Sequence, residues 1–187
     1  MARVNYLNAS DVQPDERELF RRGLNLYRVL AHSPQAARNF QSFARFLRYE
    51  SRLDPRLREL AILQIGYLTR TGYSFYGHAG IVAPEFGVTE DDIRNMICET
   101  QGVPSNLEPL ASTVIRAARE VTTEFEMSDE TFTALEAELD EAELVDLVST
   151  IAFYNAAIRF IKTMQIDVEP QRLAAYAKAQ ALYPFSS

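Results

Sequence analysis

Helical spacing of apolar residues is the feature that most constrains the fold of this chain. The stretch "DPRLRELAILQIGYLTRT", residues 54–71, places apolar side chains on every side of a predicted helix, with Asp54 available as N-cap and Pro55 at the first helical position. A helix that is apolar all round has to be enclosed by other elements. No segment alternates apolar and polar residues for long enough to predict a convincing strand. We therefore expect an all-α protein built around this helix.

Further helices are predicted before and after the central one. Residues 14–33 spread apolar side chains over one broad helical face, and the next helix begins at Pro34 with Ser33 as its N-cap. Gly72 interrupts the helical pattern, and a further helix is expected over residues 73–86. The first half of the chain is therefore predicted to be helical throughout.

The second half has the same character. Thr89 opens a capping box, the apolar run 141–166 predicts a second core helix, and Pro170 begins a C-terminal helix. Residues 101–109 are rich in glycine, proline and small polar residues and form a candidate linker between two helical halves. With 47% apolar residues, the chain is long enough to bury one core. We expect residues 1–187 to form a single domain of about eight to nine helices.

Composition limits the classes of binding partner and of site chemistry that we expect for this chain. Acidic residues outnumber basic ones 26 to 19, so the net charge is −7, which disfavours nucleic acid and anionic membrane surfaces as partners. The beginning of the chain lacks an apolar signal-peptide run, and no later segment approaches ~18 uncharged apolar residues, so we expect a cytoplasmic protein. Cys98 is the only cysteine, and there are two histidines. No disulfide, Cys-x-x-Cys pair, metal site or cofactor is therefore expected.

Glu59 and His78 are the candidate catalytic residues. A carboxylate early in a buried helix must be paired or protonated. The structural explanation for Glu59 is a salt bridge to Arg52, Arg56 or Arg58, or exposure on a narrow polar edge with Arg70. An imidazole beside a carboxylate is a good general acid or base, but a histidine among apolar neighbours is more often a hydrogen-bonded core residue. The residues alone leave both explanations open.

Helix geometry complicates the pairing of these two residues. With a turn at Gly72, Glu59 lies about 20 Å back along its helix and His78 about 9 Å forward along the next. The two side chains can meet only if the helices cross steeply, if the first helix ends before Thr71, or if the partner comes from another subunit.

Several polar residues in apolar surroundings are candidates for a ligand site. Packing is the simplest role for Tyr73 and Tyr76, although a buried phenol needs a hydrogen-bond partner. Asn155, in the middle of the second apolar run, must be hydrogen-bonded by some group.

The segment 52–97, which contains "RLDPRLRELAILQIGYLTRTGYSFYGHAGIVAPEFGVTEDDI", resembles the carboxymuconolactone decarboxylase family, whose members share the alkylhydroperoxidase D-like helical fold. The matching features are the "L-x-P-R-x-R-E" helix start, the aromatic segment ending in histidine and the "G-V-T-E-D-D-I" boundary. In the peroxidase branch, a glutamate is followed twelve residues later by Cys-x-x-Cys-x-x-x-His. Here Glu59 and His78 keep that spacing, but Thr71 and Ser74 occupy the cysteine positions. An alcohol cannot replace a redox thiolate, so the peroxidase mechanism is disfavoured.

The resemblance implies acid–base chemistry like that of the lactone decarboxylase branch. His78 and Glu59 would be catalytic in a cofactor-free lyase or hydrolase-like enzyme that acts on a small carboxylated or lactone metabolite. The expected substrate-binding residues are Ser74, Thr71, Tyr73, Tyr76 and Asn155. Family members commonly form homo-oligomers, which implies a trimer or hexamer. The alternatives are an alkylhydroperoxidase-type antioxidant protein and a non-catalytic small-molecule-binding or assembly protein.

Overall fold

The protein is all-helical in the computed structural model, which describes residues 2–185, and these residues contain no strand. The elements are η1 (Pro14–Phe20), α1 (Asn25–Leu30), α2 (Pro34–Tyr49), α3 (Pro55–Leu68), α4 (Gly72–Gly77), η2 (His78–Val82), η3 (Ala83–Phe86), α5 (Glu90–Thr100), α6 (Pro109–Thr123), α7 (Asp129–Glu136), α8 (Glu141–Met164), η4 (Pro170–Arg172) and α9 (Leu173–Leu182). The described chain thus has nine α-helices and one π-helical turn, η2, or ten in all, besides three short 3-10 segments. The all-α prediction is confirmed, but the expected number of eight to nine was too low.

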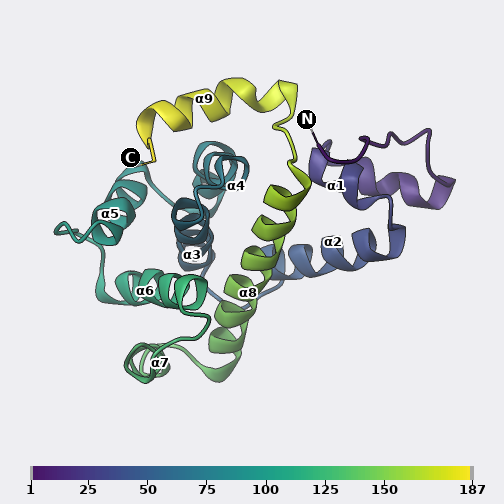
Figure 1. Ribbon diagram of the computed structural model, residues 1–187. Helices are drawn as coiled ribbons and strands as arrows, with labels where there is room; N and C mark the ends of the chain where they lie inside the picture. Colours follow the sequence, from purple (N-terminus) through teal and green to yellow (C-terminus); the bar gives the residue numbers. More distant parts are fainter. Residues whose placement is uncertain (1, 186–187) are drawn as a thin grey trace.

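α3 is the central helix, as its sequence predicts. Every residue from Leu57 to Tyr67 is buried, and α3 contacts α4, α5, α6 and α8. Figure 1 shows α3 in the middle of the molecule, with α5 and α6 on one side and α8 on the other. Each leucine or isoleucine side chain buried in this way contributes about 1.5–3 kcal/mol to stability. The predicted N-cap is also present, because the Asp54 carboxylate accepts hydrogen bonds from the backbone N–H groups of Arg56 and Leu57.

The close approach of α4 to α3 depends on Gly66. A Cβ atom at this position would lie 3.1 Å from Cα of Phe75 in α4, which is tighter than ordinary van der Waals contact. Between the two helices, the chain turns through Arg70, whose φ is +51°, and the backbone N–H of Thr71 donates to the carbonyl of Gly66. The turn therefore holds the start of α4 against the last turns of α3.

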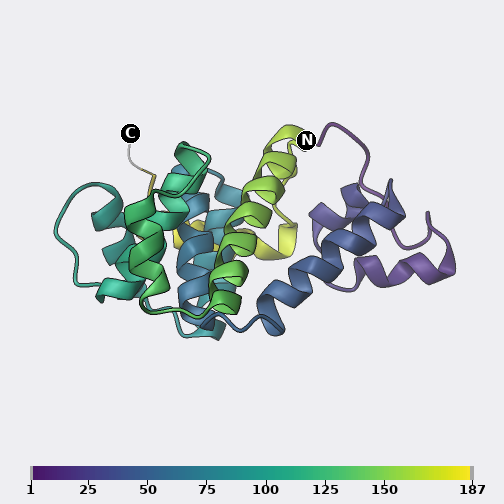
Figure 2. The same ribbon diagram turned by 90° about the horizontal axis from the view of Figure 1, so that it is seen from below.

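A smaller cluster of side chains holds the N-terminal elements together. η1, α1 and α2 lie together at one end of the molecule in Figures 1 and 2, with α8 between them and α6 in both views.

The prediction of one continuous helix over residues 14–33 is wrong, because the chain breaks between η1 and α1 at Gly23, whose φ is +61°. This left-handed conformation is accessible to glycine and stops the helix. Ser33 precedes Pro34 as predicted, but its side chain makes no capping hydrogen bond.

Among the described residues, one helix, α8, has the length and composition of a membrane span, with a mean hydropathy of 1.5 over its apolar window. The sequence had not led us to expect such a segment. Of that window, 56% is buried inside the protein. A core helix of a soluble protein meets the same criteria, so this is weak support for membrane insertion.

Candidate active site

Glu59 and His78 form a hydrogen-bonded pair within one subunit. Nδ1 of His78 lies 2.7 Å from Oε2 of Glu59. Helix geometry allowed the two side chains to meet if the first helix ended before Thr71. This condition is satisfied, because that helix, α3, ends at Leu68. The Glu59 side chain is 0% exposed, whereas that of His78 is 13% exposed. The acid is therefore enclosed by the core, and the imidazole lies between it and the outside.

The environment keeps Glu59 ionised. Burial acts to raise the pKa of Glu59, but the charge and hydrogen bond of His78, together with the charges of Arg48 and Arg58, outweigh it and hold this pKa below its ordinary value. A carboxylate only accepts hydrogen bonds, so Nδ1 of His78 carries the proton and donates it. In the neutral ring, Nε2 is then the basic nitrogen. Nε2 has no hydrogen-bond partner among residues 2–185.

Glu59 also forms one of the salt bridges that the sequence allowed as its structural explanation, the one to Arg58. Nε of Arg58 lies 3.7 Å from Oε1 of Glu59, and its guanidinium lies 4.5 Å from the centre of the Phe86 ring. Arg52 pairs instead with Asp140. The two oxygens of Glu59 thus face different partners, one histidine and one arginine.

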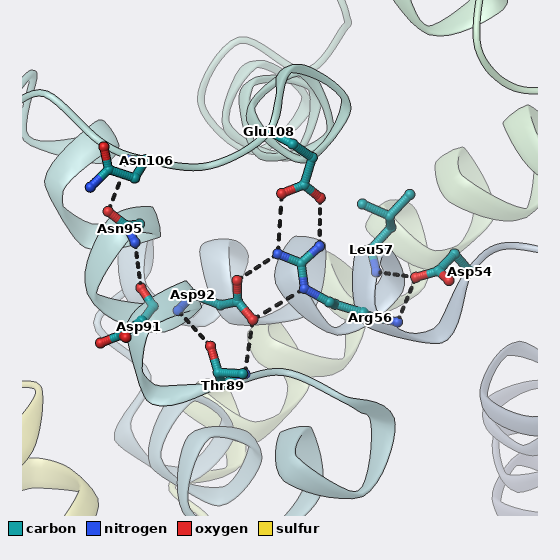
Figure 3. A network of polar contacts seen from close by, with 9 residues as sticks. All are labelled: Asp54, Arg56, Leu57, Thr89, Asp91, Asp92, Asn95, Asn106 and Glu108. Atoms are coloured by element: carbon teal, nitrogen blue, oxygen red, sulfur yellow. Dashed lines mark hydrogen bonds and ion pairs between the residues drawn. The ribbon is translucent and has the colours of Figure 1, made fainter.

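Arg56 fixes the start of α3, one turn before Glu59 (Figure 3). Its Nε lies 3.1 Å from Oδ2 of Asp92 in α5, and its Nη1 lies 2.5 Å from Oε1 of Glu108, just before α6. Figure 3 also shows Asp54 capping the same helix end. These contacts tie the segment that carries Glu59 to two neighbouring helices.

His78 stands where the helix geometry changes. It follows the last residue of α4 and begins the π-helical turn η2. Single π turns widen a helix locally and are frequent at functional sites. The predicted helix over residues 73–86 is therefore three short segments of different winding, and the change in winding begins at the candidate catalytic histidine.

A cavity of about 190 Å³ lies beside His78. Helices α1, α2, α4 and α8, the π turn and the C-terminal segment all contribute to its walls. The residues around it are Arg22, Leu24, Leu26, Tyr27, Phe40, Ala44, Arg48, Tyr73, Ser74, Gly77, His78, Ile81, Val82, Glu85, Phe153, Tyr154, Ala157, Ile161, Arg172 and Tyr176. Within residues 2–185, no group of three or more His, Cys, Asp and Glu side chains is arranged to hold a metal ion.

Two of the predicted substrate-binding residues line this cavity. The Ser74 hydroxyl has no hydrogen-bond partner in the described chain and remains available to a ligand. Tyr73 also lines the cavity, but its hydroxyl donates to Oε1 of Glu169 at 2.6 Å. The Tyr73 hydroxyl is therefore already used in a structural contact between α4 and Glu169.

The other three predicted ligand contacts lie away from this cavity. The Thr71 hydroxyl lies 3.0 Å from that of Thr69 in the turn after α3. The Tyr76 ring packs on Phe185 with the ring centres 5.0 Å apart. Asn155 is hydrogen-bonded, as a buried amide must be, but its partners are Thr122, the Ile151 carbonyl and Arg159. These side chains are used in packing and helix contacts, so the structure does not bring them to the site.

The sequence reasoning did not assign Arg48, Tyr27 or Tyr154 to the site, although it considered Tyr154 among the tyrosines that could line a polar pocket. The Tyr154 and His78 rings meet edge to face, with their centres 5.4 Å apart, and burial raises the pKa of Tyr154. Arg48 is buried on α2 beside Leu47 and four residues after Ala44. A charged residue on the apolar face of an amphipathic helix was the available signal for Arg48.

The fold belongs to a known class of helical proteins. A TM-score of 0.72 relates the chain to an uncharacterized peroxidase-related protein with an alkylhydroperoxidase AhpD core from Ralstonia eutropha JMP134, at 17% identity over 91% of this chain and 93% of that chain. An uncharacterized peroxidase-related protein from Silicibacter sp. TM1040 gives the same TM-score at 15% identity, with the same coverage of both chains. At these identities, the similarity establishes the alkylhydroperoxidase D-like fold alone.

The sequence comparison gives a family match for part of the chain. Residues 34–120 match the model of the carboxymuconolactone decarboxylase family, a span that includes Arg48, Glu59, Ser74 and His78. No curated protein gives a significant sequence match. The likeness to the carboxymuconolactone decarboxylase family therefore extends over 87 of the 187 residues.

Proposed function

We propose that this protein is a cofactor-free acid–base enzyme, a lyase or hydrolase, that acts on a small carboxylated or lactone metabolite. The observation that carries the proposal is the 2.7 Å hydrogen bond between Nδ1 of His78 and the buried Glu59 carboxylate, which leaves Nε2 beside the cavity. The family match supports the same class of chemistry.

In this mechanism, His78 is the catalytic base and acid. Its Nε2 takes a proton from a carbon next to a substrate carbonyl, or from a water molecule, and later returns a proton to the product. The Glu59 carboxylate orients the ring and stabilises the positive charge that the imidazole gains. Ser74 and Tyr154 both line the cavity, and in this mechanism their hydroxyls donate to the substrate oxygen on which negative charge develops.

The test is His78→Ala, assayed on a panel of small lactones and carboxylic acids. General acid–base catalysis typically contributes about 10²–10⁴-fold, so kcat/KM should fall by that factor for every accepted substrate. The matched control is His32→Ala, because His32 contacts only the Asn5 carbonyl at the surface and should leave turnover unchanged. Unchanged turnover in the His78→Ala variant would contradict the proposal.

The two alternatives are tested in the same experiments. Ligand binding without turnover by the wild-type protein would favour a non-catalytic binding protein. Hydroperoxide consumption with a thiol reductant, abolished by Cys98→Ser, would replace the acid–base proposal with a redox one. Cys98 lies on α5 and does not line the cavity beside His78.

By analogy with the family, we also propose a homo-oligomer, a trimer or hexamer, in the cytoplasm. Sedimentation would test the assembly, and a monomer in solution would contradict it. Because Glu59 and His78 meet within one subunit, the pair itself does not require a second copy.

A further inference from the structure

Arg48 is a buried cation whose one recorded contact of its charge within residues 2–185 is with the Tyr49 ring, 5.8 Å from the guanidinium carbon. It is 8% exposed and lines the cavity beside His78. Its Nε is inaccessible to solvent and lacks a hydrogen-bond partner, and no hydrogen bond or ion pair joins its guanidinium to any residue from 2 to 185. A buried guanidinium that is neither paired nor hydrogen-bonded is costly to stability, so the position calls for an anion from outside the chain.

The surrounding charges do not neutralise Arg48. Two guanidiniums, those of Arg48 and Arg58, act on one buried carboxylate, that of Glu59, which is already hydrogen-bonded to His78. Glu85 also lines the cavity, but it is exposed and its charge is solvated. Among the charged residues that line the cavity, Arg22, Arg48 and Arg172 outnumber Glu85, so the lining carries an excess of positive charge.

The groups near Arg48 also suit a ligand with an acidic end and an apolar body. The charge of Arg48 acts on the phenols of Tyr27 and Tyr154, and neither hydroxyl has a hydrogen-bond partner within the described chain. Phe40 and Phe153, whose ring centres are 4.7 Å apart, form an apolar wall of the same cavity.

We propose that Arg48 is the specificity-determining residue of this site and binds the carboxylate of an amphipathic organic acid, whose ring or alkyl body packs on Phe40 and Phe153 while its reactive carbon faces Nε2 of His78. The inference rests on the proposed function for the role of His78, but the anion site itself is independent of turnover. Arginine suits this role because its planar guanidinium can donate two parallel hydrogen bonds to one carboxylate.

The test measures binding by calorimetry with benzoate, phenylacetate and cyclohexanecarboxylate, each compared with its neutral amide. The wild-type protein should bind at least one acid more tightly than its amide, by about 10- to 100-fold, the value of a charged hydrogen-bonded contact. Arg48→Met should abolish this preference. The matched control is Arg45→Met, one turn earlier on α2, whose side chain is 74% exposed and pairs with Glu50.

Two further measurements keep the test decisive if Arg48→Met does not fold. The acid-to-amide ratio in the wild-type protein needs no variant, and Arg48→Lys keeps the charge while losing the planar fork, so it should weaken acid binding to an intermediate degree. Equal binding of acids and amides, or no binding of any acid at millimolar concentration, would overturn the proposal.

His78→Ala separates this inference from the proposed function. If that variant keeps the preference for acids while the wild-type protein turns over no substrate, the Arg48 site stands and the enzymatic proposal fails. If His78→Ala abolishes turnover but the wild-type protein does not prefer acids, the enzymatic proposal stands and the Arg48 site is wrong.

Discussion

The Glu59 carboxylate divides its two oxygens between an imidazole and a guanidinium. Oε2 accepts from His78, whereas Oε1 has no hydrogen bond and lies 3.7 Å from Nε of Arg58. The acid therefore stabilises the fold around a buried arginine and sets the tautomer of the candidate base. The structural and functional explanations that the sequence left open are compatible, because each uses a different oxygen.

Replacing Glu59 with glutamine removes the carboxylate charge while nearly keeping the shape of the side chain, so it tests the role of the charge. A glutamine amide can donate to Nδ1 of His78, which would place the ring proton on Nε2 and remove the base from the cavity side. We expect kcat/KM to fall by about 10²–10⁴-fold, in steady-state assays with any substrate accepted by the wild-type protein. Glu85→Gln, at the exposed rim of the cavity, should retain most activity. Equal losses in both variants would argue against a specific role for Glu59.

At the same scale, the sequence predicted the pair but only part of its surroundings. Glu59 and His78 stood out as an acid and a histidine in apolar sequence, and the family resemblance preserves their spacing along the chain. Arg48 and Tyr154 lie on α2 and α8, so their proximity to His78 depends on how distant helices pack. Thr71 was assigned to the site because it occupies a cysteine position of the peroxidase branch, and Tyr76 because it is near His78 in sequence. The contacts of both residues in the fold lie elsewhere.

Among the elements, α3 depends on its anchored N-terminal end. Arg56 joins this end to Asp92 and Glu108, so that three separate segments meet at one guanidinium (Figure 3). Capping by Asp54 and the apolar spacing of α3 are local properties, which is why the sequence predicted them. The break at Gly23 was missed because its apolar neighbours continue the helical spacing on both sides.

Arg56→Gln should lower the free energy of unfolding by about 1–2 kcal/mol at pH 7, measured by urea denaturation, because the partly buried Asp92 and the exposed Glu108 both lose their partner. Arg94→Gln is the control, since the ion pairs of Arg94 are exposed and should contribute little. A larger loss in the control would contradict this account.

The effect of Arg56→Gln should also depend on pH. Burial acts to raise the pKa of Asp92, but hydrogen bonds from Arg56 and Thr89 outweigh it and lower this pKa, and the Arg56 hydrogen bond lowers the pKa of Glu108. Carboxyl groups with a lowered pKa in the folded state add stability above their ordinary values, and that stability is lost as the pH falls through the lowered values. The difference between wild type and variant should therefore shrink as the pH is taken below 3.8, the ordinary value for Asp92. If the difference in free energy of unfolding between wild type and Arg56→Gln grew on acidification, the predicted direction would be wrong.

For the molecule as a whole, Glu169 connects distant parts of the chain. It is 1% exposed and follows α8, and its Oε1 accepts from the backbone N–H of Asn25 at 2.7 Å and from the Tyr73 hydroxyl at 2.6 Å. Burial and the charge of Glu169 raise the pKa of Tyr73. One carboxylate thus holds α1 and α4 against the C-terminal segment, and all three contribute to the cavity walls.

Glu169→Ala should destabilise the protein by about 2–4 kcal/mol, because it leaves two buried donors without an acceptor. Chemical denaturation would measure the loss, and hydrogen exchange at the Asn25 amide should accelerate more than exchange within α3. Glu18→Ala, which removes an exposed acid paired with Arg21, should leave both quantities nearly unchanged. Faster exchange in α3 than at Asn25 would mean that Glu169 does not act mainly on the N-terminal elements.

The cavity extends beyond the segment that defines the family. The acid–base pair and Arg48 lie within residues 34–120, whereas Tyr27 comes before that segment, and Tyr154 and Tyr176 come after it. Under the proposed function, chains that share the Glu59–His78 pair can therefore differ in the molecules they accept by changing only their flanking helices. The choice of ligand has to be read also from the parts of the chain that the family match leaves out.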